Sequence, residues 1–195
     1  MSARLMNRVG LVLVFLLIGS TGNALAQGTT KAPAPAAQAP AGAGPILVFE
    51  TDKGTFEIET YPGDAPKTVA HIVGLVDKRF YNGLRVHRVV PRFVIQLGDP
   101  QSRDVSKKAQ WGTGGSGTSI GVAEFSKTKR HEVGSVSMAH GGDPTKADSQ
   151  FFVVTGPATH LNGKHQIFGK VVSGMDVVMK IQEGDRIVRA TVKTS

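Results

Sequence analysis

The chain has 195 residues, a net charge of +8 and no cysteine. Without cysteine, neither a disulfide nor lipid attachment through a thiol is available, so the fold depends on its core alone. Hydrophobic residues make up 40% of the chain, which is enough for one domain with a substantial core.

The positive charge is spread thinly along the sequence. Its one dense cluster is Lys127-Thr128-Lys129-Arg130-His131, and no aromatic residue interleaves with it. Surfaces that bind nucleic acid usually combine a basic stripe with stacking aromatic side chains. We therefore interpret the cluster as a solvated loop and expect no nucleic-acid partner.

The first 26 residues have the pattern of a secretory signal peptide. Arg4 and Arg8 precede an apolar run from Val9 to Ile18, and Ala24-Leu25-Ala26 is a small-residue cleavage site. The run is shorter than the about 20 residues that a membrane-spanning helix needs. We expect cleavage after residue 26, no stable membrane insertion afterwards, and a periplasmic location. The remaining chain has 21 Lys and Arg against 15 Asp and Glu, a net charge of +6.

Residues 27–44 are rich in Ala, Pro and Gly and can bury little apolar area, which predicts a disordered linker. The domain at 45–195 opens with two strands, 46–50 and 55–59, joined by a hairpin turn in which Gly54 takes a positive φ. A helix then opens at Asp64-Ala65-Pro66. Its apolar residues recur at helical spacing, at Val69, Ile72, Val73 and Val76.

A strand–corner–strand element is expected at residues 86–99, where apolar residues alternate on either side of Pro91. Residues 100–119 follow as a long polar, glycine-rich segment. Gly112 to Gly117 formally fits G-x-G-x-x-G, but no strand precedes it and no helical pattern follows, so we reject a dinucleotide site. We interpret the segment as a flexible loop that borders a groove.

The second half of the chain predicts four more strands and one helix. The strands fall at 134–139, 149–155, 165–172 and 186–192. The helix is expected to be capped by Ser173, to carry apolar residues at Met175, Val178 and Met179, and to end near Gly184. About eight strands without regular strand–helix alternation favour a mainly β fold, an antiparallel barrel with two α-helices, over a parallel sheet.

Arg88 is the unusual residue of the 86–99 segment, because it places a permanent charge among apolar neighbours. From the pattern alone, it could face solvent or pair with a carboxylate such as Asp99. Two longer motifs favour another role. The first is Val86-His87-Arg88-Val89-Val90-Pro91-Arg92-Phe93-Val94-Ile95-Gln96-Leu97-Gly98-Asp99; the second comprises Ser137-Met138-Ala139-His140, Ser149-Gln150-Phe151-Phe152-Val153 and Leu161 to Val171.

The two motifs resemble the signatures of cyclophilin-type peptidyl-prolyl isomerases, and the resemblance runs from about Pro45 to Val192. It implies a closed eight-stranded antiparallel β-barrel capped by two α-helices, which agrees with the element count. It also implies an enzyme that accelerates rotation about Xaa-Pro bonds and needs no cofactor and no metal. The expected partners are unfolded or partly folded proteins with Xaa-Pro bonds, and the expected state is a monomer.

By position, the resemblance places the catalytic arginine at Arg88, together with Phe93 and Gln96. It places the residues that hold the substrate in the same two motifs, at Val94, Ala139, His140, Gly141, Gln150, Phe152, His160, Leu161 and His165.

The chain departs from the family pattern at two of these positions and at two others in the first motif. Family members often have glycine at Arg92 and Leu97 and asparagine at His140, and a widely studied subgroup has tryptophan at His160. The loop 142–148 is also one residue longer. The change at His160 predicts weakened binding of the cyclic-peptide inhibitor cyclosporin, with catalysis retained.

Three other functions fit the sequence less well. A hydrolase built on Ser149 and a histidine would lack a G-x-S-x-G motif, and a metal site built on His160 and His165 would lack a third ligand of suitable spacing. A binding or chaperone module that keeps the groove but turns over slowly is the serious alternative. The intact Arg88 and Gln96 argue against it, whereas the changes at Arg92, Leu97 and His160 leave it open.

Overall fold

The computed structural model describes residues 44–193, which contain eight strands and two α-helices. The strands are β1 Ile46–Thr51, β2 Gly54–Thr60, β3 Arg88–Val90, β4 Val94–Leu97, β5 Ser135–Met138, β6 Phe151–Val154, β7 Ile167–Ser173 and β8 Ile187–Val192. The α-helices are α1 Pro66–Asp77 and α2 Met175–Val178, and the 3₁₀ helices are η1 Pro100–Arg103, η2 Val105–Gln110, η3 Pro144–Lys146 and η4 Thr159–Leu161. The predicted signal peptide at 1–26 and nearly all of the predicted linker at 27–44 lie outside the described residues.

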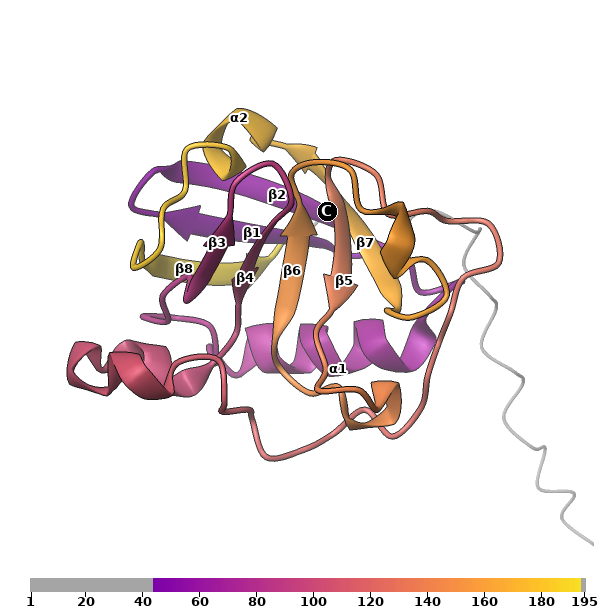
Figure 1. Cartoon of the computed structure of the whole chain (residues 1–195), viewed down its shortest axis with the longest axis horizontal. Helices are drawn as coiled ribbons and strands as arrows, with labels where there is room; N and C mark the ends of the chain where they lie inside the picture. Colours follow the sequence, from indigo (N-terminus) through magenta and orange to yellow (C-terminus); the bar gives the residue numbers. More distant parts are fainter. Residues whose placement is uncertain (1–43, 194–195) are drawn as a thin grey trace, which may run out of the picture. The chain divides into compact units, whose positions relative to one another are not determined.

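All eight strands join one antiparallel sheet in the order β3-β4-β6-β5-β7-β2-β1-β8. The sheet curls into a half-barrel with α1 across one end and α2 at the other (Figure 1). The segments that precede the edge strands β3 and β8 are joined by an isolated bridge from Arg85 to Arg186 with flanking backbone hydrogen bonds. The mainly β prediction with eight antiparallel strands is thus confirmed, whereas a regular ladder that closes the barrel is not found among residues 44–193.

The first hairpin forms as its sequence predicts. Thr51 pairs with Gly54 at the turn, and Gly54 takes a φ of 125°, which a residue with a side chain rarely adopts. In β2, Phe56 and Ile58 are buried while Glu57 and Glu59 are partly exposed, so the two-residue period separates a core face from a wet face.

Helix α1 packs its predicted apolar stripe on the core, with Val69, Ile72 and Val76 buried. Pro66 occupies the first turn, where no backbone donor is needed, but Ala65 at the N-cap offers no side-chain acceptor. The carboxylate of Glu124, which lies 56 residues beyond Thr68, fills this role. It accepts from Thr68 N at 2.8 Å and from Lys67 N at 3.0 Å.

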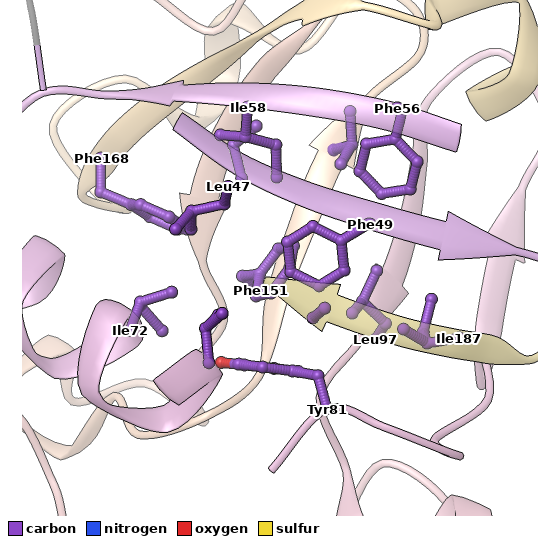
Figure 2. Packing of buried hydrophobic residues seen from close by; sticks show 14 of the residues in the cluster. Leu47, Phe49, Phe56, Ile58, Ile72, Tyr81, Leu97, Phe151, Phe168 and Ile187 are labelled. Atoms are coloured by element: carbon purple, nitrogen blue, oxygen red, sulfur yellow. The ribbon is translucent and has the colours of Figure 1, made fainter. Parts of the chain in front are cut away.

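The core is built around aromatic rings from four strands and the segment after α1 (Figure 2). The Phe49 ring stacks on Phe56 at 5.3 Å between centroids and meets Phe151 and Tyr81 edge to face, each at 5.7 Å. Each such buried side chain contributes about 1.5–3 kcal/mol through lost apolar exposure. This packing fixes β6, which carries groove residues on its other face.

The structure corrects three local predictions. Ser173 is the last residue of β7 and does not cap the second helix. The N-cap of α2 is Gly174, at a φ of 75°, and the helix then lasts for a single turn. Residues 100–110, expected to be loop, form η1 and η2, each started by an aspartate that accepts from the backbone N–H two residues later. The strand expected from Val86 begins at Arg88.

Candidate active site

The hairpin of β3 and β4 carries the first motif. Arg88 pairs with Gln96 across the ladder, and Phe93 N donates to Val90 O at 3.1 Å to close the corner. At this corner Arg92 takes a φ of 59°, a left-handed conformation that suits glycine better than a residue with a side chain. The tight corner places Arg88 and Phe93 on the rim of one groove.

A line of hydrogen bonds runs inward from the arginine. Arg88 Nη1 donates to Gln96 Oε1 at 3.2 Å, and Gln96 Nε2 donates to Gln150 Oε1 at 2.9 Å. Gln150 Nε2 donates to the carbonyl oxygens of Gly112 and Gly114, at 2.9 and 2.7 Å. Because a guanidinium has five donors, Arg88 keeps donors for a ligand.

An apolar pocket lies beside this line, on the face of β4 and β6 that points away from the core. Period-two geometry explains it: Ile95 and Phe151 enter the core, so Val94 and Phe152 face the other way. The pocket cluster consists of Val94, Phe152, Val154 and Ala158, with Phe93, Ala139 and Leu161 packed against it.

The arginine and the pocket share one cavity of about 550 Å³. Every site residue named from the sequence lines it except His160. His160 instead lies flat on the Phe93 ring, with centroids 5.3 Å apart and planes 22° apart, just outside the cavity. Sequence reasoning anticipated that a glycine-rich loop borders the groove, but it did not name these further lining residues: Gly112, Thr113, Gly114, Lys146, Asp148 and Ser149.

Two stacked histidines, His140 and His165, form another part of the groove wall. The rings of His140 and His165 lie 4.3 Å apart, and His165 meets Phe152 edge to face at 5.4 Å. His140 Nδ1 accepts from Gly142 N–H at 3.2 Å, which leaves its Nε2–H to donate to Lys164 O at 2.8 Å. His140 therefore ties together the two loops that flank this side of the groove.

Burial favours the neutral form of three histidines at or beside the site, which are His165, His87 and His131. Burial, the largest cause, lowers the pKa of His165 below its usual value, and the neighbouring His140, His131 and Lys164 lower it further against a hydrogen bond to Met138 O. Burial also lowers the pKa of His87 and of His131. The lowered pKa favours a neutral His165, which then acts as a polar aromatic surface in the groove.

The rival chemistries find no support among residues 44–193. Ser149 is fully buried, and its hydroxyl donates to Gly98 O at 2.7 Å rather than to a histidine. No group of three or more His, Asp or Glu side chains is placed to hold a metal ion in this part of the chain. Asp99 does not pair with Arg88; it is fully buried and accepts from Gln101 N and Gly112 N.

Among residues 44–193, no helix is long and apolar enough to cross a membrane.

Comparison with known proteins agrees with this geometry. The model of the family described as "Cyclophilin type peptidyl-prolyl cis-trans isomerase/CLD" matches residues 46–194. "Peptidyl-prolyl cis-trans isomerase B" of Bacillus subtilis is 43% identical over 134 residues, covering 69% of this chain and 87% of that protein. A "Peptidyl-prolyl cis-trans isomerase" of Helicobacter pylori is 40% identical over 149 residues, covering 75% and 85%.

Solved structures have the same fold. A cyclophilin-type isomerase of Cryptosporidium parvum superimposes with a TM-score of 0.67 at 23% identity, over 77% of this chain and 98% of that one. The same protein was also solved in the presence of the dipeptide Ala-Pro, again with a TM-score of 0.67. The family match over most of the described residues is decisive: this chain belongs to the cyclophilin-type peptidyl-prolyl cis-trans isomerases.

Proposed function

We propose that Arg88 lowers the barrier to Xaa-Pro rotation by donating a hydrogen bond to the proline nitrogen as the bond twists. The barrier of about 18–20 kcal/mol arises from amide resonance. In the twisted transition state, the nitrogen loses conjugation and its lone pair becomes an acceptor. A donor placed there binds the transition state more tightly than either ground state.

The observation that carries this proposal is the position of Arg88. Its guanidinium is held by Gln96 at 3.2 Å on the rim of the same cavity that contains the apolar pocket. An arginine is suited to the role because it stays protonated and presents its donors in a rigid fork. The reaction needs neither a nucleophile nor a proton transfer.

The remaining predicted residues would hold the two sides of the bond. Phe93, Phe152 and Leu161 would clasp the proline ring and exclude water from it. Gln96 and the backbone at His140 and Gly141 would anchor the flanking peptide, so that one side of the bond turns against the other. Binding energy gathered along the groove is then available to fix the reacting geometry.

The biological substrates in this proposal are unfolded or partly folded proteins with exposed Xaa-Pro bonds. Binding of an Ala-Pro unit is supported by the Cryptosporidium relative that was solved with that dipeptide. The pattern at residues 1–26 supports export, so the proposed clients are proteins that fold in a periplasm, where the chain would act as a monomer without a cofactor.

Exchange spectroscopy by NMR on a short Ala-Pro peptide tests the activity. With a small molar fraction of the full chain added, cis and trans signals are expected to exchange within seconds, against tens to hundreds of seconds for the free peptide. Exchange that stays at the rate of the free peptide, with folded protein present, would contradict the proposal.

A further inference from the structure

The loop from Gly112 to Gly117 forms one wall of the groove, and a carboxylate holds it at each end. At its start, Asp99 accepts from Gly112 N–H. At its far end, Asp148 accepts from the hydroxyl of Ser116 and, at 2.9 Å, from Gly117 N–H. Asp99 belongs to the first motif, whereas Asp148 stands before Ser149-Gln150 and has no role in the mechanism described so far.

The loop backbone lies directly on these carboxylates. A Cβ at Gly115 would sit 2.5 Å from Asp148 Oδ2, and one at Gly114 would sit 2.5 Å from Asp99 Oδ1. Real Cβ atoms do not approach so closely, so the glycines permit a contact that a side chain would break. Helix α1 lies behind the far end, where His71 Nε2 is 3.5 Å from Asp148 Oδ1 and both side chains are mostly buried.

The position of this loop decides how Gln150 is oriented. Gln150 uses both of its amide hydrogens on the carbonyl oxygens of Gly112 and Gly114, so its own oxygen must face Gln96. Gln96 must then turn its NH₂ group toward Gln150 and its oxygen toward Arg88. The loop carbonyls therefore fix the polarity of the whole line, ending at the guanidinium.

We propose that Asp148 is a positioning residue: by holding Ser116 and Gly117, it keeps the loop carbonyls on Gln150 and so orients Gln96 and Arg88 for the reaction. This inference rests on the proposed function of Arg88. Asp148 acts through the loop and makes no contact with the proline nitrogen. It extends the site from the groove to helix α1, by way of residues far apart in the sequence.

Kinetics of three variants of the full chain test the proposal. Asp148→Ala is expected to lower kcat for a short Xaa-Pro peptide by about tenfold to a hundredfold with KM little changed, because a misplacement of about 1 Å in a positioning group can cost ~10²-fold. Asp148→Asn, which keeps an acceptor oxygen, is expected to retain part of the lost rate. Asp143→Ala is the matched control: it lies in the same loop and loses two comparable bonds, to Thr145 N and Oγ1, but does not touch the 112–117 loop.

A double-mutant cycle separates positioning from a general loss of structure. In a Gln150→Ala background the line of hydrogen bonds between the loop and Arg88 is already broken, so adding Asp148→Ala is expected to change kcat by less than about twofold. If the two changes lower kcat independently, so that the loss in the double variant is the product of the two single losses, the proposal is overturned. An Asp148→Ala protein with the kcat of wild type would overturn it too.

Side-chain NMR of the same proteins keeps this proposal distinct from the proposed activity. The amide proton signals of Gln96 and Gln150 and the Nε–H signal of Arg88 are expected to shift in Asp148→Ala and in Ser116→Ala but not in Asp143→Ala. Unchanged signals would overturn the positioning role even if the enzyme is active. If the wild-type protein shows no turnover but the signals still shift in Asp148→Ala and Ser116→Ala, the positioning role is upheld and the isomerase mechanism is contradicted.

Discussion

Tyr81 donates its hydroxyl to the backbone oxygen of Ser149 at 3.0 Å, in a fully buried contact that joins the segment after α1 to the entry of β6. Burial, the larger cause, and the nearby Asp148 raise the pKa of Tyr81 well above its usual value, so the donor is permanent at physiological pH. The bond supports the chain immediately before Gln150, whose amide stands in the middle of the line to Arg88.

Tyr81→Phe is expected to lower the free energy of unfolding by about 1–3 kcal/mol, because a buried acceptor loses its partner. Urea unfolding measures this loss. Tyr61→Phe is the matched control, since Tyr61 makes no hydrogen bond through its hydroxyl to another described residue, and a change within about 0.5 kcal/mol is expected. Equal effects of the two changes would show that the Ser149 contact contributes nothing specific.

Glu124→Ala is expected to destabilise the fold by about 0.5–2 kcal/mol, because the carboxylate caps the first turn of α1 in place of a local N-cap side chain. Thermal or urea unfolding measures the change. Glu132→Ala removes an exposed carboxylate from the same stretch of chain and serves as the control, with an effect within about 0.5 kcal/mol. A loss no larger than that of the control would argue against the capping role.

Acid is expected to destabilise the protein from about pH 6.5 downward. Burial lowers the pKa of His87, His131 and His165 in the folded chain from the ordinary value of 6.5, so the unfolded chain binds more protons in that window. Stability from this source is fully present above pH 6.5 and is lost as the pH falls toward the folded pKa values. Urea unfolding between pH 8 and 5 measures it.

Three exposed carboxylates with lowered pKa values act at lower pH than these histidines. Hydrogen bonds to Ser106, Thr145 and Lys180 lower the pKa of Asp104, Asp143 and Asp176 from 3.8, so their contribution is lost only below about pH 4. His131→Gln is expected to flatten the slope between pH 6.5 and 5. A free energy of unfolding that stays constant from pH 8 to 5 would contradict the account.

The rate of turnover is a separate quantity. Because the proposed donor is an arginine, turnover is expected to be nearly independent of pH around neutrality.

His160→Trp is expected to raise the affinity for cyclosporin by about tenfold or more, because the indole adds apolar area and a donor beside Phe93. Inhibition of peptide isomerisation measures the gain. The kcat for a short peptide is expected to change by less than about threefold, since His160 lies outside the cavity and does not contact the proposed reacting atoms. An unchanged affinity would show that His160 does not limit inhibitor binding.

Local patterns were sufficient to predict most of the strands. Alternation in β2 separates Phe56 and Ile58 from the glutamates, and the spacing of Val69, Ile72 and Val76 identifies α1. The 3₁₀ helices also carry a readable signal, because Asp99-Pro100 and Asp143-Pro144 each combine an N-cap aspartate with proline in the first turn. The predicted second helix is too long mainly at its C-terminal end, because the helix ends at Val178 rather than near Gly184, while the positive φ of Gly174 delays its start by one residue.

The far side of the groove could not be predicted in the same way. Asp148 meets Ser116 and Gly117 across more than 30 residues, and Gln150 meets Gly112 and Gly114 across still more. Such contacts leave no periodicity in the sequence. The glycine-rich composition of 112–117 indicates a loop near a groove, but only the folded sheet places that loop against Asp148.

The most direct test of the mechanism compares the full chain with Arg88→Ala in two measurements on one Xaa-Pro peptide. The proposed mechanism predicts that Arg88→Ala lowers kcat by about 10²–10³-fold, because a donor used only in the transition state is lost. Peptide affinity, measured by NMR titration of the same samples, is predicted to stay within about threefold of wild type, since the apolar pocket is intact. An Arg88→Ala protein with the turnover of wild type would contradict the role of the arginine, and a folded wild-type chain that binds the peptide without accelerating its rotation would identify a binding module instead.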